Sequence, residues 1–184
     1  KLNLIGSHNI LNSVGAIALC SYIGIDLKVI KKSLKEFGGV QRRLTKVCEI
    51  NGNDFFDDYA HHPTEIKSVL DSLKKSNPEK RIISVFQPHR YSRLKLLKKE
   101  FALSFKSSDR LILCPVYPAG EKIDKQYDDK KFATQIAKNS DVEVILIYNQ
   151  EDLYKFFKKN LLKDELIIGM GAGSITKWMR EIPF

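Results

Sequence analysis

Continuous apolar runs that alternate with helical segments constrain the fold of this 184-residue chain more than any other feature. Such runs, apolar on both faces, are typical of strands buried inside a parallel sheet. They begin the segments "RIISVFQP" (81–88), "RLILCPVYP" (110–118), "VEVILIY" (142–148) and "ELIIGMGAGSI" (165–175). Apolar residues at helical spacing predict helices over 91–106, 128–138 and 151–162. The pattern therefore predicts an α/β fold, with a Rossmann-like, mostly parallel sheet and helices on both of its faces.

A hairpin and a helix precede the first of these runs. "LTKVCEI" and "DFFDDYA" flank the pair Asn51-Gly52, which is a strong signal for a tight hairpin turn. Pro63 stands at a permitted first-turn position of a helix that we expect to reach Ser76. The apolar residues of this helix are spaced to face inward, and they are Ile66, Val69, Leu70 and Leu73.

The first forty residues follow a different pattern. Apolar residues near helical spacing predict a helix over about residues 9–23, and Asp26 is placed to cap a second helix that ends at Gly38. The apolar face of the second helix is predicted to be Leu27, Ile30, Leu34 and Phe37. Gly15 inside the first helix costs on the order of 1 kcal/mol relative to alanine, so we expect close packing there. "FGGVQRRL" (37–44) then indicates a hinge or a domain boundary.

Composition restricts the partners of the chain. The net charge of +9 allows an anionic ligand or a nucleic acid. The lysines are dispersed and do not alternate with exposed aromatic residues. We therefore interpret them as residues of solvent-exposed faces and not as a nucleic-acid-binding surface. Three widely spaced cysteines without a CxxC pair favour a reducing compartment over disulfides or zinc. No apolar run approaches the roughly 20 residues of a membrane span, so no membrane partner is expected.

Four polar clusters follow the predicted strands, at the edge where α/β sheets bind ligands. They are "DDYAHH" (57–62), "QPHRYSR" (87–93), "VYPAGE" (116–121) and "GMGAGS" (169–174). Three of the four histidines of the chain fall in these clusters, and the fourth, His8, stands in a separate "GSHN" turn. The clusters predict a ligand-binding cleft along one edge of the sheet.

The cluster "DDYAHH" admits several interpretations. Asp57, Asp58, His61 and His62 are all possible metal ligands, but their spacing matches no strong metal motif. His62 has an equally good structural role as the cap of the helix at Pro63, and Asp57 as the residue that fixes the turn. Asp58 is placed at a strand end, where a carboxylate accepts hydrogen bonds from both hydroxyls of a ribose.

The cluster "QPHRYSR" brings His89, Arg90 and Arg93 within one turn of a helix amino terminus. Two guanidinium groups and free backbone N–H groups make a clamp for a carboxylate or a phosphate. We weigh this role above a pair of plain surface arginines because of the strand-end position. "GMGAGS" is a weaker signal, for a phosphate cradle or for close packing, and "QRR" (41–43) is either a phosphate contact or a solvated segment.

Six motifs together resemble a known family. "GSHNILN", "FGGVQRRL", "DDYAHHPTEI", "FQPHRYSRL", "VYPAGE" and "GMGAGSI" occur in this order through nearly the whole chain. They resemble the carboxyl-terminal part of the Mur ligase family, and within it the members that join L-alanine to UDP-N-acetylmuramate. The resemblance implies that residues 1–40 are the end of a central ATP-binding domain and that residues 41–184 are the Rossmann-like carboxyl-terminal domain.

The resemblance also implies ligands and roles. The partners would be ATP, Mg²⁺, UDP-N-acetylmuramate and L-alanine, in peptidoglycan synthesis in the cytoplasm, without nucleic acid or membrane. The nucleotide would be bound by His8, Asn9, Asn12, Arg43 and Asp58. The alanine and muramoyl side would be lined by His61, His89, Arg90 and Arg93. The resemblance assigns this chain no catalytic residue and no metal ligand, and Tyr59 receives no role.

One departure from the family limits what the chain is expected to do. The sequence contains no GxxxxGK[ST] phosphate loop, and the family's magnesium ligands belong to the missing amino-terminal and central domains. We therefore expect the chain alone not to catalyse ligation, because phosphoryl transfer needs that electrostatic stabilisation. The alternatives are a stand-alone nucleotide-binding or regulatory module without catalysis and, below it, a nucleic-acid-binding domain driven by charge.

Overall fold

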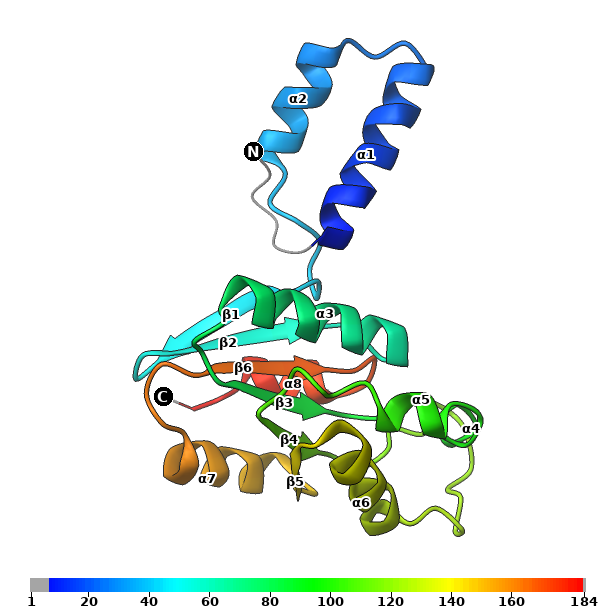
Figure 1. Cartoon of the computed structure of the whole chain (residues 1–184), viewed down its shortest axis with the longest axis vertical. Coiled ribbons are helices and arrows are strands. Elements are labelled where there is room, and N and C mark those ends of the chain that lie inside the picture. The colour runs from blue at the N-terminus through cyan, green and yellow to red at the C-terminus, as the bar shows by residue number, and fades with distance from the viewer. Residues whose placement is uncertain (1–6, 184) are drawn as a thin grey trace.

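The computed structural model describes residues 7–183, with side chains from Asn9 onward. A pair of helices stands apart from a larger α/β unit, and an extended segment joins the two (Figure 1). The helices are α1 (Ser7–Tyr22) and α2 (Leu27–Glu36). The connecting residues 37–44 are called the hinge segment below.

Six strands form one sheet in the order β1-β2-β6-β3-β4-β5. The strands are β1 (Thr45–Ile50), β2 (Asn53–Asp58), β3 (Ile82–Phe86), β4 (Arg110–Leu113), β5 (Glu143–Leu146) and β6 (Leu166–Met170). Only β1 and β2 pair antiparallel, as the predicted hairpin, and every other pairing is parallel. This arrangement confirms the predicted fold class, and it places β6 between β2 and β3.

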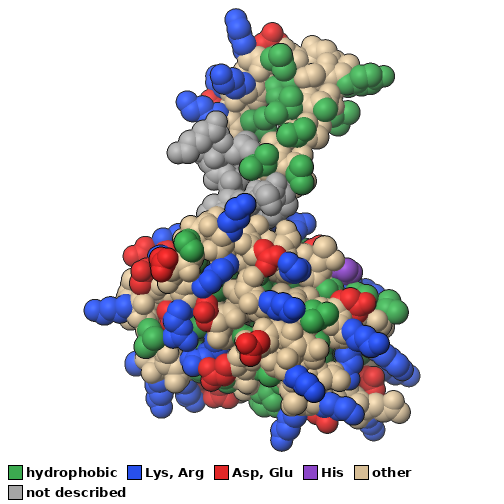
Figure 2. Space-filling model, viewed as in Figure 1, with side chains coloured by type: hydrophobic (Ala, Val, Ile, Leu, Met, Phe, Trp, Pro, Cys, Tyr) green, Lys and Arg blue, Asp and Glu red, His purple; other side chains and the backbone are tan. Residues whose placement is uncertain are grey.

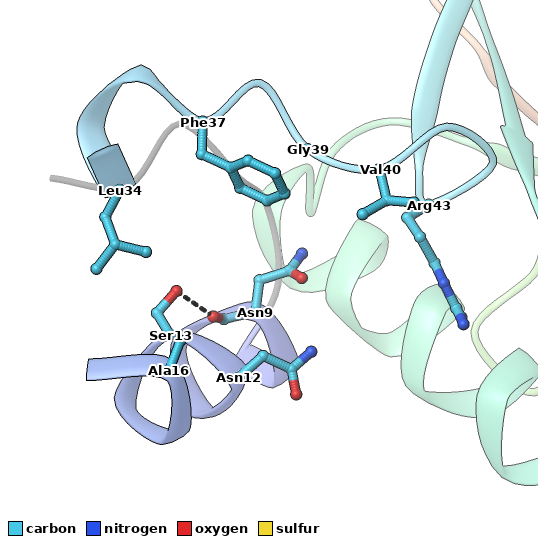
Figure 3. Close-up of a pocket in the computed structure, with 9 residues that line it drawn as sticks. All are labelled: Asn9, Asn12, Ser13, Ala16, Leu34, Phe37, Gly39, Val40 and Arg43. Carbon is cyan, nitrogen blue, oxygen red and sulfur yellow. Dashed lines mark hydrogen bonds between the residues drawn. The ribbon is translucent and has the colours of Figure 1, made fainter. Parts of the chain in front are cut away.

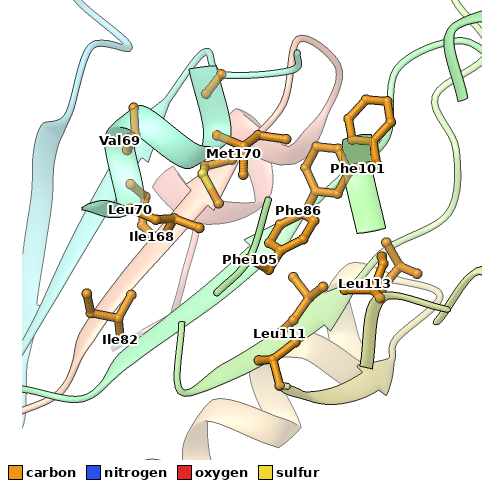
Figure 4. Packing of buried hydrophobic residues seen from close by; sticks show 14 of the residues in the cluster. Val69, Leu70, Ile82, Phe86, Phe101, Phe105, Leu111, Leu113, Ile168 and Met170 are labelled. Carbon is orange, nitrogen blue, oxygen red and sulfur yellow. The ribbon is translucent and has the colours of Figure 1, made fainter. Parts of the chain in front are cut away.

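Helices cover both faces of the sheet. The helices after the hairpin are α3 (Pro63–Ser76), α4 (Tyr91–Leu96), α5 (Lys98–Ala102), α6 (Asp129–Ser140), α7 (Gln150–Asn160) and α8 (Ile175–Arg180). One apolar cluster joins the sheet to α3–α6, and Figure 4 shows Leu70, Phe86, Phe101 and Ile168 packed within it. A second cluster joins the opposite face to α7 and α8. Burial on both faces explains why the strands read as continuous apolar runs.

The predicted single helix over residues 91–106 is wrong. Two short helices occupy this stretch, and they meet at Leu97, whose φ of −112° and ψ of 28° are not helical. Leu97 packs against the same core as Leu94 and Phe101. Packing against the sheet therefore overrides the helical preference of the local sequence.

The helix pair exposes much of its apolar surface (Figure 2). The exposed side chains are those of Ile10, Leu11, Val14, Leu19, Tyr22, Ile23, Leu27 and Val29. The expectation of close packing at Gly15 is wrong, because a Cβ added there would meet no atom within 4 Å. None of the helices that the structure describes is long and apolar enough to cross a membrane.

Helix α4 allows a matched test of the core. Leu94 is 3% exposed and packs in the cluster under α3–α6, whereas Leu96 on the same helix is 80% exposed. We expect Leu94→Ala to lower the free energy of unfolding by about 2–5 kcal/mol, because it leaves a cavity in the core. Leu96→Ala should change it by less than about 0.5 kcal/mol. Urea unfolding followed by Trp178 fluorescence measures both, and equal losses would contradict the packing described here.

Candidate functional site

A cavity of about 410 Å³ lies between the helix pair and the hinge segment (Figure 3). Its lining residues are Asn9, Asn12, Ser13, Ala16, Leu34, Phe37, Gly39, Val40 and Arg43. Carboxamides pair with the edge of an adenine ring, aromatic rings stack on bases, and guanidinium groups bind phosphates. The side chains that face this cavity therefore suit a purine nucleotide.

Three of the predicted nucleotide residues, Asn9, Asn12 and Arg43, are brought together in this cavity. His8 lies in the first turn of α1, but its side chain lies outside the described residues. Phe37 was assigned from the sequence to the apolar face of the second helix. In the structure it caps the end of α2 in an extended conformation, is 44% exposed and lines the cavity.

Asp58 ties the hinge segment to the end of β2. Its carboxylate is 2% exposed, and its two oxygens accept hydrogen bonds of 2.7 Å from the backbone N–H groups of Leu44 and Ala60. Burial raises the pKa of Asp58, although the hydrogen bonds from Ala60 and Leu44 oppose this shift. In this conformation the carboxylate anchors the hinge, and its predicted contact with a ribose stays a prediction.

Arg42 makes a second attachment of the hinge segment. Its Nη2 donates a hydrogen bond of 2.6 Å to the carbonyl oxygen of Gly171, directly after β6. Its carbonyl oxygen accepts from the N–H of Tyr59 at 2.8 Å, and its guanidinium lies 4.5 Å from the centre of the Tyr59 ring. The sequence singled out neither contact, because both join segments that are distant along the chain.

Asp57 and His62 have structural roles. Asp57 is fully buried and accepts hydrogen bonds from Thr176 Oγ1 at 3.1 Å and Arg180 Nε at 3.2 Å, so it fastens α8 to the sheet. The structural interpretation of the sequence had Asp57 fix the turn after β2. In the structure its two oxygens bind α8 instead. Of the two roles left open for His62, the structure shows the cap of α3, and Glu65 completes a capping box.

A row of aromatic rings runs along the carboxyl edge of the sheet. The rings of Tyr59 and His61 are 5.0 Å apart, those of His61 and His89 are 5.8 Å apart, and those of His89 and Tyr117 stack at 5.7 Å. His61 Nδ1 lies 2.9 Å from the carbonyl oxygen of Tyr59. The two predicted histidines are thus brought together, with Tyr117 as a neighbour that the sequence did not single out.

The predicted anion clamp lies beside this row. Arg93 Nη1 lies 3.4 Å from His89 Nδ1, and Arg90 is exposed at the residue before α4. The N–H and the hydroxyl of Ser92 donate to Glu121, and these bonds hold the pKa of Glu121 below its ordinary value. Glu121 thereby fixes the "VYPAGE" loop against the start of α4.

The pKa of His89 is lowered from its ordinary value of 6.5. Burial is the main cause, and the positive charges of Arg93 and Arg90, with that of His61 when it is protonated, add to it. A neutral imidazole is consistent with the geometry, because His89 Nδ1 can accept a hydrogen bond from Arg93 only without its proton. His89 therefore favours the uncharged form near neutral pH.

The glycine turn after β6 packs closely against the same edge. A Cβ at Gly173 would lie 2.5 Å from both Gln87 Oε1 and Tyr117 Cγ, and one at Gly171 would lie 2.8 Å from the carbonyl oxygen of Gln87. Gln87 Oε1 also accepts a hydrogen bond of 3.0 Å from the N–H of Ile175. Close packing thus accounts for these glycines.

Among the side chains that the structure describes, from Asn9 to Pro183, no three histidine, cysteine or acidic groups come together in a cluster that would hold a metal ion. Asp57 and Asp58 are occupied by partners on opposite faces of the sheet, although they are adjacent in sequence. The cluster "DDYAHH" is therefore divided among a helix anchor, a hinge anchor, the ring row and a helix cap.

Comparison with known proteins agrees with this geometry. The family model described as Mur ligase, glutamate ligase domain, matches residues 42–173. The UDP-N-acetylmuramate–L-alanine ligase of Pelagibacter ubique is 51% identical over 183 residues, which are 100% of this chain and 39% of the relative. The ligase of the same name from Caldicellulosiruptor bescii is 42% identical over 177 residues, covering 96% of this chain and 38% of the relative. This chain therefore spans about two fifths of the length of these relatives.

Solved structures give the same result. The UDP-N-acetylmuramate–alanine ligase of Thermotoga maritima superposes with a TM-score of 0.80 at 28% identity, over 99% of this chain and 38% of that structure. A murein peptide ligase of Psychrobacter arcticus, at 23% identity, shares the fold with a TM-score of 0.70 over 99% of this chain and 37% of that structure. Because the family model matches most of the chain and the shared fold agrees with it, the chain belongs to the Mur ligase family.

Proposed function

We propose that this chain is the carboxyl-terminal part of an ATP-dependent ligase that joins L-alanine to UDP-N-acetylmuramate in peptidoglycan synthesis. The observation that supports this most is the meeting of His61 and His89 with Arg93 at one sheet edge. That edge is joined through the hinge segment to a cavity suited to a nucleotide. A cytoplasmic place in cell wall biogenesis, cell shape and cell division would follow from this activity.

Two parts of the proposed enzyme meet in this chain. Residues 1–40 would belong to the central ATP-binding domain and residues 41–184 to the carboxyl-terminal domain, with the remaining domains supplied by the intact protein. The exposed apolar face of α1 and α2 supports this division, because such a face is typical of helices that pack within a larger domain. The start of the family match at residue 42 supports it as well.

The hinge cavity would bind the nucleotide. Asn9 and Asn12 present carboxamides that suit the adenine edge, Phe37 offers a ring face, and Arg43 lies where phosphates would meet it. ATP, bound with Mg²⁺ held by the missing part, would supply the phosphoryl group that activates the muramoyl carboxylate as an acyl phosphate. Asp58 would hold the hinge closed against the sheet or, if the hinge opens, meet the ribose.

The ring row and the clamp would receive the amino acid. Arg90 and Arg93 provide positive charge for its carboxylate. The neutral His89 keeps Arg93 oriented, and His61 stands beside it to accept a hydrogen bond from the amino group. The amine then displaces phosphate from the activated carboxyl group, so that an amide, ADP and phosphate result.

The isolated chain provides the first test. Residues 1–184 lack a phosphate loop, so we expect no ADP release above background when ATP, UDP-N-acetylmuramate and L-alanine are supplied together. The full-length protein should turn over under the same conditions. Turnover by the isolated chain would contradict the expectation, and ATP binding without any activity in the full-length protein would favour a nucleotide-binding or regulatory module.

The clamp is tested in the full-length protein. Arg93→Ala removes a charged donor from the amino-acid side, so kcat/KM for L-alanine should fall about 10- to 100-fold, as expected for a lost charge-assisted hydrogen bond. Lys95→Ala is the matched control, because Lys95 lies on the same helix but lines a different cavity beside Tyr127. Equal effects of the two variants would exclude a specific role for Arg93.

The protonation of His89 is tested by titration of its ring in NMR spectra. We expect a pKa below 6.5 that rises in Arg93→Gln, because one of the nearby positive charges is gone. Arg110→Gln, at the amino-terminal end of β4 and thus at the opposite edge of the sheet, should leave it unchanged. The folded-state pKa lies below the unfolded value, so stability is full above the unfolded pKa and decreases as pH falls through the folded pKa. A pKa at or above 6.5 in the unchanged chain would contradict the assignment.

A further inference from the structure

Arg42 connects three segments that are far apart in the sequence. Its backbone has a φ of 60°, and this left-handed conformation turns the hinge segment toward the sheet. Its carbonyl oxygen accepts from the N–H of Tyr59, just after β2, and its Nη2 donates to Gly171, just after β6. The hinge segment is thus attached to two neighbouring strand ends by one residue.

The guanidinium of Arg42 also fixes Tyr59. It lies 4.5 Å from the ring centre, within the range of a cation–π contact. Tyr59 is 37% exposed, so solvent alone would leave its ring free to rotate, and the guanidinium limits that freedom. Arg42 and Tyr59 together are called the latch below.

The latch reaches the amino-acid side of the site, which is lined by His61 and His89, through the backbone of Tyr59. The carbonyl oxygen of Tyr59 can only accept, so the proton between it and His61 Nδ1, 2.9 Å away, belongs to the histidine. In the neutral ring, Nε2 is then the basic nitrogen of His61. The edge of the Tyr59 ring lies against the same imidazole, at 5.0 Å between ring centres. Glu65 Oε2 lies 3.5 Å from the same Nδ1 and favours the same tautomer. Tyr59 and Glu65 therefore hold the proton on Nδ1, and the Tyr59 ring limits the orientation of His61.

His89 has the opposite arrangement. Its Nδ1 faces the donor Arg93 Nη1, so its proton belongs on Nε2. The two imidazoles, 5.8 Å apart, thus present one acceptor and one donor nitrogen. This complementary pair persists only while each ring keeps its partners, and the latch holds one of the two acceptors beside His61 Nδ1, the carbonyl oxygen of Tyr59.

We propose that Arg42 and Tyr59 are positioning residues that link docking of the hinge segment to the arrangement of His61 on the amino-acid side. The expected effect on KM for L-alanine rests on the proposed ligase function. The expected effect on the orientation and tautomer of His61 does not depend on the reaction. When the hinge segment leaves the sheet, Tyr59 loses both the guanidinium and the hydrogen bond to the Arg42 carbonyl. The carbonyl oxygen and the ring of Tyr59 then lose their fixed positions beside His61, so that Glu65 is left to hold the imidazole and its orientation is no longer fixed.

The first experiment measures the tautomer of His61 in the whole 184-residue chain, from the nitrogen shifts of its ring. Every variant keeps the backbone carbonyl of residue 59. We expect protonated Nδ1 to dominate in the unchanged chain and in Tyr59→Phe, which also keeps the ring that Arg42 holds in place. Arg42→Gln and Tyr59→Leu should shift the population toward protonated Nε2. Arg110→Gln is the matched control, because Arg110 also lies over a ring, that of Phe156 at 5.9 Å, far from the site.

The second experiment uses the full-length protein with the same variants. Arg42→Gln and Tyr59→Leu should raise KM for L-alanine on the order of tenfold, as expected when one positioning contact is lost, while KM for ATP stays within about twofold. Tyr59→Phe and Arg110→Gln should match the unchanged enzyme. Circular dichroism and Trp178 fluorescence establish that each variant is folded.

The outcomes separate the latch from the ligase. An unchanged His61 tautomer in folded Arg42→Gln and Tyr59→Leu overturns the latch, whatever the protein catalyses. A shifted tautomer in a full-length protein that forms no amide supports the latch and rejects the proposed function. A shifted tautomer with equal increases in KM for ATP and L-alanine also overturns the proposal, because the latch would then act on the whole cleft and not on His61.

Discussion

The insertion of β6 between β2 and β3 is the constraint on which the site depends. Parallel hydrogen bonding on both sides of β6 aligns Asp58 with Met170 and Phe86 with Met170. The segments after these three strands therefore leave the sheet at the same level. The ring row, the arginine clamp and the glycine turn meet because of this register, and the contacts among them follow from it.

Two adjacent carboxylates show how strand geometry distributes tasks. Successive side chains of a strand point to opposite faces, so Asp57 faces α8 and Asp58 faces the hinge segment. Both are buried with their oxygens engaged, which is the condition under which buried carboxylates are tolerated. The same pair of residues thus fastens a helix on one side of the sheet and the hinge segment on the other.

The sheet and the clustering at its edge could be predicted from the sequence because both depend on local patterns. Apolar runs identified β3 to β6, and the rule for strand ends then brought His61, His89 and Arg93 to one edge, as the structure has them. The contacts of Arg42 could not be predicted, since Gly171 is 129 residues away and no local pattern reports it. The break at Leu97 was missed for a similar reason, because the packing of that side chain against the core decides it.

The central place of β6 has a consequence for the order in which the sheet is completed. During synthesis β2 and β3 emerge well before Leu166–Met170, so each has an open edge where β6 will lie. Until then the hairpin β1-β2 and the ribbon β3-β4-β5 have no strand in common. A ribosome that stalls before residue 166 therefore leaves two separate half-sheets with unpaired inner edges, and these edges are templates for pairing with another chain.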